Sequence, residues 1–331
     1  MRIKIVAAIC GLAATFGLAA PAAAADGDTT HIRLAGANRY ETAVAISKYA
    51  FVPQFPGDDY PVTVASGADF PDALAAGPLA AAEGGPLLLV PRDGALPSTV
   101  RGELSRLGPL WINIAGGAGA VSSLMESQLK DYEEVYRLYG KDRYETAVDL
   151  AVETGAFDTT VFIATGSSFP DALGGSAAAG RLGGSLMLTR RTALPADTAL
   201  LLEYGQPAKV VVLGGTGVVD TSVVREIQRI VPGAKVERWA GSDRYETTAA
   251  ISRKTYPQGA DTVYLASGAD YPDALAGAPV AALEGAPLLL TRKECVPAAT
   301  KAEITRLGAT NVVVLGGTGV VSNNAAKLRA C

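Results

Sequence analysis

A short motif that combines an arginine, a tyrosine and a glutamate occurs three times in this 331-residue chain. Its copies span 38–42, 142–146 and 243–247, and each begins with Asn or Asp and continues as Arg-Tyr-Glu-Thr. An arginine guanidinium is a planar, permanently charged fork that suits carboxylate and phosphate groups. Two interpretations stay open for these arginines: contact with a ligand, or a salt bridge to an acid such as Asp72.

The same motif has the pattern of a helix start. Its first residue (Asn38, Asp142 or Asp243) stands three positions before a glutamate (Glu41, Glu145 or Glu246). This spacing predicts a capping box, in which each side chain satisfies a free backbone N–H at the beginning of the helix. Capping explains the acids, but it does not explain why the arginine and the tyrosine return in every copy.

A second motif, Pro-Asp-Ala-Leu, returns at 71–74, 170–173 and 272–275. Proline suits a first helical turn, and the aspartate that follows compensates the positive end of the helix dipole. The Ala and Gly residues after it, as in 73–77, let the helix pack closely on a sheet. The motif therefore predicts mainly architecture, with an acid at the start of each helix.

A third motif, Gly-Gly-x-Gly, stands at 116–119, 214–217 and 316–319, after an apolar run. Glycines at such a place leave backbone N–H groups free to face a ligand, and helix N-termini favour anions. The motif lacks the Lys-Ser/Thr ending of a Walker loop, and the Gly-x-Gly-x-x-Gly pattern of dinucleotide-binding proteins is absent. A tight turn explains any single copy equally well.

The elements that position these motifs can be read from the first copy. Short apolar runs that alternate with longer helical segments predict a parallel sheet covered by helices on both faces, an α/β fold. The expected strands are 31–34, 62–65, 87–90 and 111–115, and the expected helices are 39–49, 72–82, 98–107 and 121–130.

All three motifs follow a strand and precede a helix, so they gather at the carboxyl edge of the sheet, where open α/β sheets bind ligands. We therefore predict one crevice in each module, and three linked crevices suit a repetitive polymer because they add avidity. The candidate polymer-binding residues are Arg39, Tyr40, Asp72, Gly116, Gly117, Arg143, Tyr144, Asp171, Gly214, Gly215, Arg244, Tyr245, Asp273, Gly316 and Gly317.

The repeat spacing sets the expected domain organisation. The first motif returns after 104 and then 101 residues, which is long enough for a small domain with its own core. Residues 1–25 combine Arg2 and Lys4, an apolar run and an Ala-rich exit, the pattern of a cleaved secretory signal. The expected division is a signal peptide at 1–25 and α/β modules at 26–131, 132–233 and 234–331.

Charge and cysteine content narrow the class of protein. Without residues 1–25 the chain has 27 Lys+Arg against 33 Asp+Glu, a net charge of −6, which argues against nucleic acid as a partner. No later segment predicts a membrane span. Cys295 and Cys331 stand 36 residues apart, and an even pair in an exported protein indicates a disulfide, with two free thiols as the alternative.

These repeats resemble the cell wall-binding repeat 2 family of Gram-positive bacteria. The resemblance covers nearly the whole chain after residue 25, and it implies non-covalent attachment to an anionic secondary wall polymer, such as a teichoic acid or other wall polysaccharide. It also implies three modules packed about a pseudo-threefold axis. In the third copy the residues that carry it are 243–247, 266–275, 287–290 and 314–319, and both earlier copies hold counterparts.

The chain departs from the family's pattern in one strand. The Ile-Leu-Leu triplet that the family links with polymer anchoring corresponds here to 87–89, 186–188 and 288–290. The middle copy also has Ser185 where the others have Pro86 and Pro287. Either the polymer affinity differs between the copies, or the polymer differs from the family's usual one.

An enzyme is not expected. Zinc amidases and Ser-His-Asp hydrolases need imidazole groups, and the chain has a single histidine, His31. No metal or cofactor is predicted. A glycoside hydrolase needs only two carboxylates, which Glu41 and Asp72 could supply. The expected function is non-catalytic anchoring in the cell wall or outside the cell; a self-assembling S-layer or adhesin-like protein is the alternative, and a wall-glycan hydrolase is less favoured.

Overall fold

The computed structural model describes residues 29–53, 55, 59–270 and 272–331. The expected signal peptide, residues 1–25, lies outside them. The first repeat contains β1 (Thr30–Leu34), α1 (Arg39–Ala50), β2 (Val62–Ser66), α2 (Pro71–Glu83), β3 (Leu87–Val90), α3 (Ser98–Leu107), β4 (Ile112–Ala115) and α4 (Ser123–Leu129). These bounds confirm the expected alternation to within one or two residues at each end.

The other two repeats have the same order of elements. The second contains β5 (Val135–Leu138), α5 (Arg143–Thr154), β6 (Thr160–Thr165), α6 (Pro170–Arg181), β7 (Ser185–Thr189), α7 (Ala196–Gly205), β8 (Lys209–Leu213) and α8 (Thr221–Ile230). The third contains β9 (Lys235–Trp239), α9 (Arg244–Thr255), β10 (Thr262–Ser267), α10 (Pro272–Leu283), β11 (Leu288–Thr291), α11 (Ala298–Leu307), β12 (Asn311–Leu315) and α12 (Asn323–Ala326).

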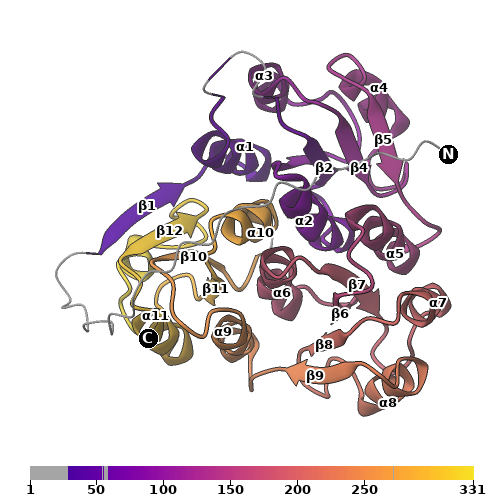
Figure 1. Cartoon of the computed structure of the whole chain (residues 1–331). Helices are drawn as coiled ribbons and strands as arrows, with labels where there is room; N and C mark the ends of the chain where they lie inside the picture. The colour runs from indigo at the N-terminus through magenta and orange to yellow at the C-terminus, as the bar shows by residue number, and fades with distance from the viewer. Residues whose placement is uncertain (1–28, 54, 56–58, 271) are drawn as a thin grey trace.

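The strands form three parallel four-stranded sheets, as the α/β prediction requires, in the orders β3-β2-β4-β5, β7-β6-β8-β9 and β1-β12-β10-β11. Each sheet takes its last strand from the repeat that follows: β5 completes the first sheet and β9 the second. The third sheet is completed by β1, with Leu34 opposite Leu315. Figure 1 shows β1 in indigo beside β12 in yellow, so the first and last repeats join and close a ring.

The sheets therefore do not coincide with the expected modules 26–131, 132–233 and 234–331. Each of these sequence segments opens with the strand that finishes the preceding sheet. The reason is topological, because a repeat that starts with an edge strand can complete its neighbour's sheet as readily as its own. As repeats of sequence the three segments remain a prediction, but the units of packing are shared between neighbours.

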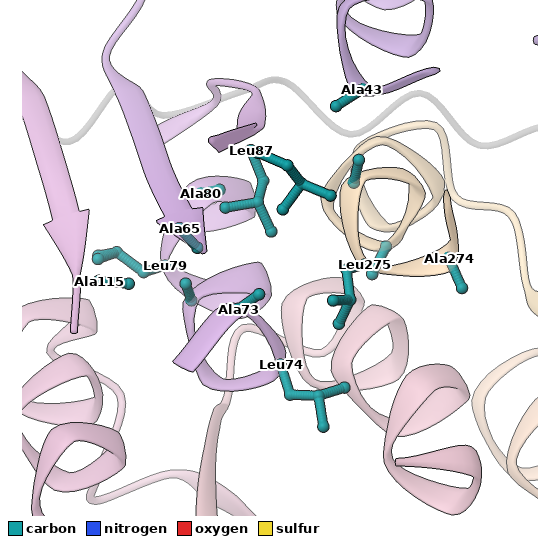
Figure 2. Close-up of a cluster of buried hydrophobic side chains, with 14 of the residues drawn as sticks. Ala43, Ala65, Ala73, Leu74, Leu79, Ala80, Leu87, Ala115, Ala274 and Leu275 are labelled. Atoms are coloured by element: carbon teal, nitrogen blue, oxygen red, sulfur yellow. The ribbon is translucent and has the colours of Figure 1, made fainter. Parts of the chain in front are cut away.

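Helices α2, α6 and α10 pack against one another at the centre of the molecule, about a pseudo-threefold axis (Figure 1). Small residues at matching positions permit the close approach. A Cβ on Gly77 would lie 2.2 Å from the Oγ of Ser176, and one on Gly180 would lie 2.8 Å from the Cβ of Ala81. Figure 2 shows how α2 and α10 bring Leu74 and Leu275 into one buried cluster.

The leucine-rich triplets of the third strand of each repeat lie in this interior. All nine side chains of 87–89, 186–188 and 288–290 are at most 2% exposed. The resemblance connects these triplets with polymer anchoring, but their burial leaves them no surface for direct contact with a polymer. Their contribution is to the packing of β3, β7 and β11 between helices.

The third repeat ends differently from the others. Helix α12 is only four residues long, and a disulfide joins Cys331 to Cys295 in the segment after β11, with a Cα–Cα distance of 4.8 Å. A parallel bridge between Val296 and Ala330 accompanies it. This cross-link holds the last residues against the sheet that β1 completes. Within the described residues, no helix has the length and apolar character needed to cross a membrane.

Candidate functional site

Each Arg-Tyr-Glu-Thr motif begins a helix with the expected cap. The Asn38 side chain accepts hydrogen bonds from the backbone N–H groups of Tyr40 and Glu41, both at 3.0 Å, and Asp142 and Asp243 do the same at α5 and α9. The glutamate reaches one residue further back than a standard capping box, because Glu41 accepts from the N–H of Ala37 at 3.0 Å. Such a cap typically stabilises a helix by about 1 kcal/mol.

The arginine and the tyrosine of the motif cover the backbone just after the second strand of their own repeat. Nη1 of Arg39 donates to the carbonyl of Gly67 at 2.5 Å. Nη1 of Arg143 donates to Gly166 at 2.7 Å, and Arg244 contacts the carbonyl of Gly268 in the same way. A Cβ on Gly67 would lie 2.8 Å from Cε1 of Tyr40, so this glycine permits the close approach. The arginines are thus fixed through one N–H to a carbonyl.

Beyond that carbonyl, each arginine faces the aspartate of a neighbouring repeat. Burial raises the pKa of Asp72 on α2, and the charge of Arg143 on α5 opposes that rise; Nη2 of Arg143 lies 3.5 Å from Asp69. Arg244 acts on Asp171 in the same way, and Arg39 acts on Asp273. The arginine beside Asp72 is thus Arg143 of the next repeat, and its ion pair is with Asp69, so both a salt bridge and a ligand contact stay open for these arginines. The shared fourth strand is the cause, because it delivers the start of the next helix to the edge of the preceding sheet.

The first glycine of each Gly-Gly-x-Gly loop has a conformation that side chains disfavour. Gly116 has φ +109°, Gly214 has φ +89° and Gly316 has φ +100°. The aspartate of the second motif packs directly on this backbone, since a Cβ on Gly116 would lie 2.4 Å from Oδ2 of Asp72. The loop is therefore a tight turn that makes room for the carboxylate, and the second glycines of two loops, Gly117 and Gly317, line clefts.

An arginine that the sequence analysis did not assign ties this loop to the next repeat. Nη1 of Arg137 donates to the carbonyl of Gly116 at 2.7 Å, and Arg33 and Arg238 donate to Gly316 and Gly214 at 2.6 Å. The signal was available, because an arginine stands six residues before Arg39, Arg143 and Arg244 in every copy.

These contacts surround a cleft at the junction of neighbouring repeats. The cleft between the first and second repeats has a volume of about 560 Å³, and its walls include Asp69, Asp72, Arg92, Lys141 and Arg143. The cleft between the third and first repeats, of about 470 Å³, is lined by Asn38, Arg39, Thr42, Asp270 and Asp273. The second junction brings together Asp171, Arg244 and Thr247.

The candidate tyrosines lie against the hydrophobic core, unlike the arginines, which reach toward the junctions between repeats. Tyr40, Tyr144 and Tyr245 are partly buried and pack against the hydrophobic core. The guanidinium of Arg190 lies 4.6 Å from the ring centre of Tyr144, and that of Arg292 lies 5.8 Å from Tyr245. Their hydrophobic contacts explain why a tyrosine returns in each copy.

Burial dominates the electrostatics of the aspartates. It raises the pKa of Asp72 to about 6; Asp69 adds to the rise, and Arg143 opposes it. Burial also raises the pKa of Asp273 to about 6; the Thr42 hydroxyl and Arg39 oppose the rise, and Asp270 adds to it. These two aspartates therefore lose their charge a little below neutral pH.

The same burial raises the pKa of Asp171 at the second junction. A hydrogen bond from Thr247 and the charge of Arg244 oppose this rise, and Asp243 adds to it. In the part of the chain that the structure describes, there is no group of three or more His, Cys, Asp or Glu side chains that could hold a metal ion.

The two carboxylates considered for glycoside hydrolysis are not paired. Glu41 accepts hydrogen bonds from the backbone of Ala37 and the side chain of Asn38, at the start of α1. Asp72 lies at a different junction, between the first and second repeats. Glu41 thus serves as a helix cap, and Asp72 packs on the backbone of Gly116, so each carboxylate has a structural role of its own.

Three segments of the chain, 33–126, 137–224 and 238–326, match the family model described as cell wall binding domain 2. The chain belongs to this family. The three matches correspond to the three repeats, so the resemblance drawn from the motifs is confirmed. The matched model describes a binding domain and not a catalytic one, and the family places the protein in the cell wall or outside the cell.

Relatives and solved structures agree with this assignment. The chain is 33% identical to the amidase enhancer of Bacillus subtilis over 88% of its own length and 39% of that protein. It is 31% identical to N-acetylmuramoyl-L-alanine amidase LytC of the same organism, over 92% of its length and 59% of the relative. The structure resembles Cwp6 from Clostridium difficile, with a TM-score of 0.82 and 29% identity over 91% of this chain and 48% of that one.

A second solved structure is similar to a comparable degree. Cwp8 from Clostridium difficile matches with a TM-score of 0.79 and 30% identity, over 88% of this chain and 50% of that one. The chain thus spans between 39% and 59% of the length of these four proteins. What it shares with them is the three-module cell wall-binding part.

Proposed function

We propose that the chain anchors itself non-covalently to the cell wall by binding an anionic secondary wall polymer, of the teichoic acid type, at its three inter-repeat junctions. The observation that carries the proposal is the recurrence of one arrangement at every junction. Each junction combines the arginine of one repeat with the buried aspartate and the glycine loop of its neighbour.

The cations of the first cleft suit a phosphate or carboxylate group. Arg143 is fixed through Nη1 to the carbonyl of Gly166, while its side chain stays 37% exposed. Arg92 lines the same cleft, and so does Lys141, although its ammonium is already paired with Glu145 and Asp197. Since Arg143 is held in place before a ligand arrives, little side-chain entropy remains to be lost when an anion binds.

The aspartates act against anion binding when they are ionised. Asp72 and Asp69 lie on the same walls as the cations, so the first cleft has a mixed charge at neutral pH. Because burial raises the pKa of Asp72 to about 6, mildly acidic conditions neutralise this carboxylate and reduce the negative charge of the cleft. The affinity of one cleft for an anion is therefore modest and dependent on pH.

Three junctions joined in one ring compensate for modest affinity at each. A polymer that repeats its anionic group can occupy a second cleft after the first, and linked binding events raise avidity without new contacts. The ring closure by β1 and β12 fixes the relative positions of the clefts. A repetitive wall polymer therefore gains more from this arrangement than a small soluble anion.

The experiment is co-sedimentation of the purified chain with cell walls before and after acid removal of their anionic polymers. We expect binding to intact walls and loss of binding to stripped walls. Equal binding to both would replace the polymer with peptidoglycan as the ligand. Ordered sheets or filaments formed without any wall would instead support the self-assembling surface protein.

A further inference from the structure

A groove on the outer side of the second repeat has no part in the polymer clefts. It lies between α5 and α7 and has a volume of about 460 Å³. Four of its side chains are open to solvent: Leu200 is 65% exposed, Tyr204 78%, Tyr139 57% and Val152 48%. The apolar lining consists of Tyr139, Val148, Val152, Leu200, Leu201 and Tyr204.

The first and third repeats have a polar network at the same place. Glu103 is fully buried there, accepts a hydrogen bond from Ser47 at 2.5 Å and pairs with Arg106 at 2.6 Å. In the third repeat, Glu303 accepts from Ser252 at 2.6 Å and pairs with Arg306 at 2.7 Å. In both repeats a charged arginine thus covers the contact between two helices, α1 and α3 in the first repeat and α9 and α11 in the third.

The second repeat replaces every member of this network with an apolar or aromatic residue. Ala151, Leu201 and Tyr204 stand where the first repeat has Ser47, Glu103 and Arg106. Neighbouring positions of the second repeat also have larger or more apolar side chains than their counterparts in the other repeats. Val152 replaces a lysine or arginine, Leu200 replaces glycine or alanine, and Tyr139 replaces alanine.

Burial explains Ala151 and Leu201, but it does not explain Leu200 and Tyr204, because both of these side chains face solvent. Contiguous exposed apolar side chains on a soluble protein commonly mark a site of interaction. In this chain the other two repeats support the same interpretation, because they form the same fold without large exposed apolar side chains at these positions. The apolar surface of the second repeat is an addition to the fold.

The rim of the groove is acidic. Glu145, Asp149 and Asp197 line it, and Lys141 bridges two of them, at 3.4 Å from Glu145 and 2.8 Å from Asp197. Asp149 and Asp197 are also specific to this repeat, since the first repeat has Ala45 and Thr99 at these positions. The groove has therefore gained acids as well as apolar residues.

We propose that the groove between α5 and α7 is a docking site for a positively charged, amphipathic segment of another protein. Aliphatic side chains of that segment would cover Val152, Leu200 and Leu201, and its lysines or arginines would pair with the rim carboxylates. Charge complementarity selects this occupant, because the acidic rim repels an anionic polymer. A second copy of the chain, with a net charge of −6 after residue 25, is disfavoured for the same reason.

The test is photo-crosslinking in cells that produce the full chain. A benzoylphenylalanine is placed at position 200 in one variant, and at position 102 or 302 in the matched controls, which are the equivalent sites of the first and third repeats. We expect an adduct from position 200 alone. Sequencing of the adduct should identify a peptide with aliphatic residues and several Lys or Arg.

The identified segment is then synthesised and titrated against purified protein by fluorescence anisotropy. Tyr204→Arg, which installs the residue of the other two repeats, should raise the Kd at least tenfold. Leu124→Arg, at another exposed leucine on α4, should leave the Kd unchanged while showing the same thermal unfolding.

Several results would overturn the proposal. These are an adduct that joins two copies of the chain, an adduct with wall carbohydrate, no adduct at position 200, and an acidic partner segment. Equal binding of the synthetic segment to wild type and Tyr204→Arg would do so as well. The wall co-sedimentation assay is independent of this site, so failure here leaves the proposed anchoring function untouched.

Discussion

The inter-repeat clefts and the outer faces of the repeats differ in how far the three copies agree. Every junction has the same arginine, aspartate and positive-φ glycine. On the outer faces, two repeats have a buried glutamate and an arginine, whereas the second has Leu201 and Tyr204. A cleft residue contacts two repeats at once, so a substitution there alters the packing of both. An outer face belongs to one repeat only, so its residues can change without affecting a neighbouring repeat.

The largest effect on stability should come from removing one member of the polar network on the outer face of the first repeat, which consists of Ser47, Glu103 and Arg106. Arg106→Ala leaves the carboxylate of Glu103 buried beside Ser47 without its cation, and we expect a loss of about 3 kcal/mol in the free energy of unfolding. Equilibrium urea unfolding measures it.

A matched variant sharpens the comparison between repeats. The triple change Ser47→Ala, Glu103→Leu and Arg106→Tyr copies the second repeat, removes both partners together and should cost at most about 1.5 kcal/mol. A loss as large as that of Arg106→Ala would show that the first repeat cannot adopt the outer face of the second.

A methyl group in the cleft should have the next largest effect. Gly116→Ala places a Cβ 2.4 Å from Oδ2 of Asp72 on a residue with φ +109°, so we expect a loss of about 2 kcal/mol in unfolding free energy. Gly119→Ala is the control, because its Cβ would meet no atom within 4 Å and should change stability by less than about 0.5 kcal/mol. Similar losses for the two variants would contradict the structural role assigned to the first glycine.

A smaller effect is expected from pH. The folded-state pKa values of Asp72 and Asp273 are about 6, above the ordinary value of 3.8, so the folded state binds these protons more tightly than the unfolded state. Their contribution to stability therefore grows as the pH falls through 6, and it is complete near pH 4. Wall binding should strengthen severalfold from pH 7 to pH 5, because Asp72 and Asp273 are then neutral and no longer repel an anionic polymer.

The double variant Asp72→Asn and Asp273→Asn tests the source of this pH dependence. It should bind walls at pH 7 as strongly as the wild type does at pH 5, and its binding should change little over that range. A pH dependence that persists in the variant would place its origin elsewhere in the protein or in the polymer itself.

Much of the fold could be predicted from the sequence because its signals are local. The caps at Asn38, Asp142 and Asp243 and the apolar runs of the strands depend on neighbouring residues, and they lie where the spacing placed them. The family could be predicted for a related reason, since three motifs in fixed order are more specific than any one of them.

The composition of the clefts could not be predicted in the same way. The partner of Arg143 is Asp72 in another repeat, and this pairing follows from the strand exchange that pairs β5 with β4; the closure of β1 on β12 brings Arg39 to Asp273 in the same way. Those are features of topology that no local pattern encodes. The groove of the second repeat was missed for a different reason: Leu200 and Tyr204 are ordinary helix residues until they are compared with Gly102 and Arg106 of the first repeat.

The most direct test of the central claim is wall co-sedimentation of a triple variant, Arg39→Gln, Arg143→Gln and Arg244→Gln. A control carries the same change at Arg101, Arg225 and Arg229, which are exposed on α3 and α8. We predict that the cleft variant loses wall binding by at least a hundredfold while it unfolds cooperatively, and that the control binds as the wild type does. Unchanged binding of the cleft variant would contradict the assignment of the polymer site to the inter-repeat clefts.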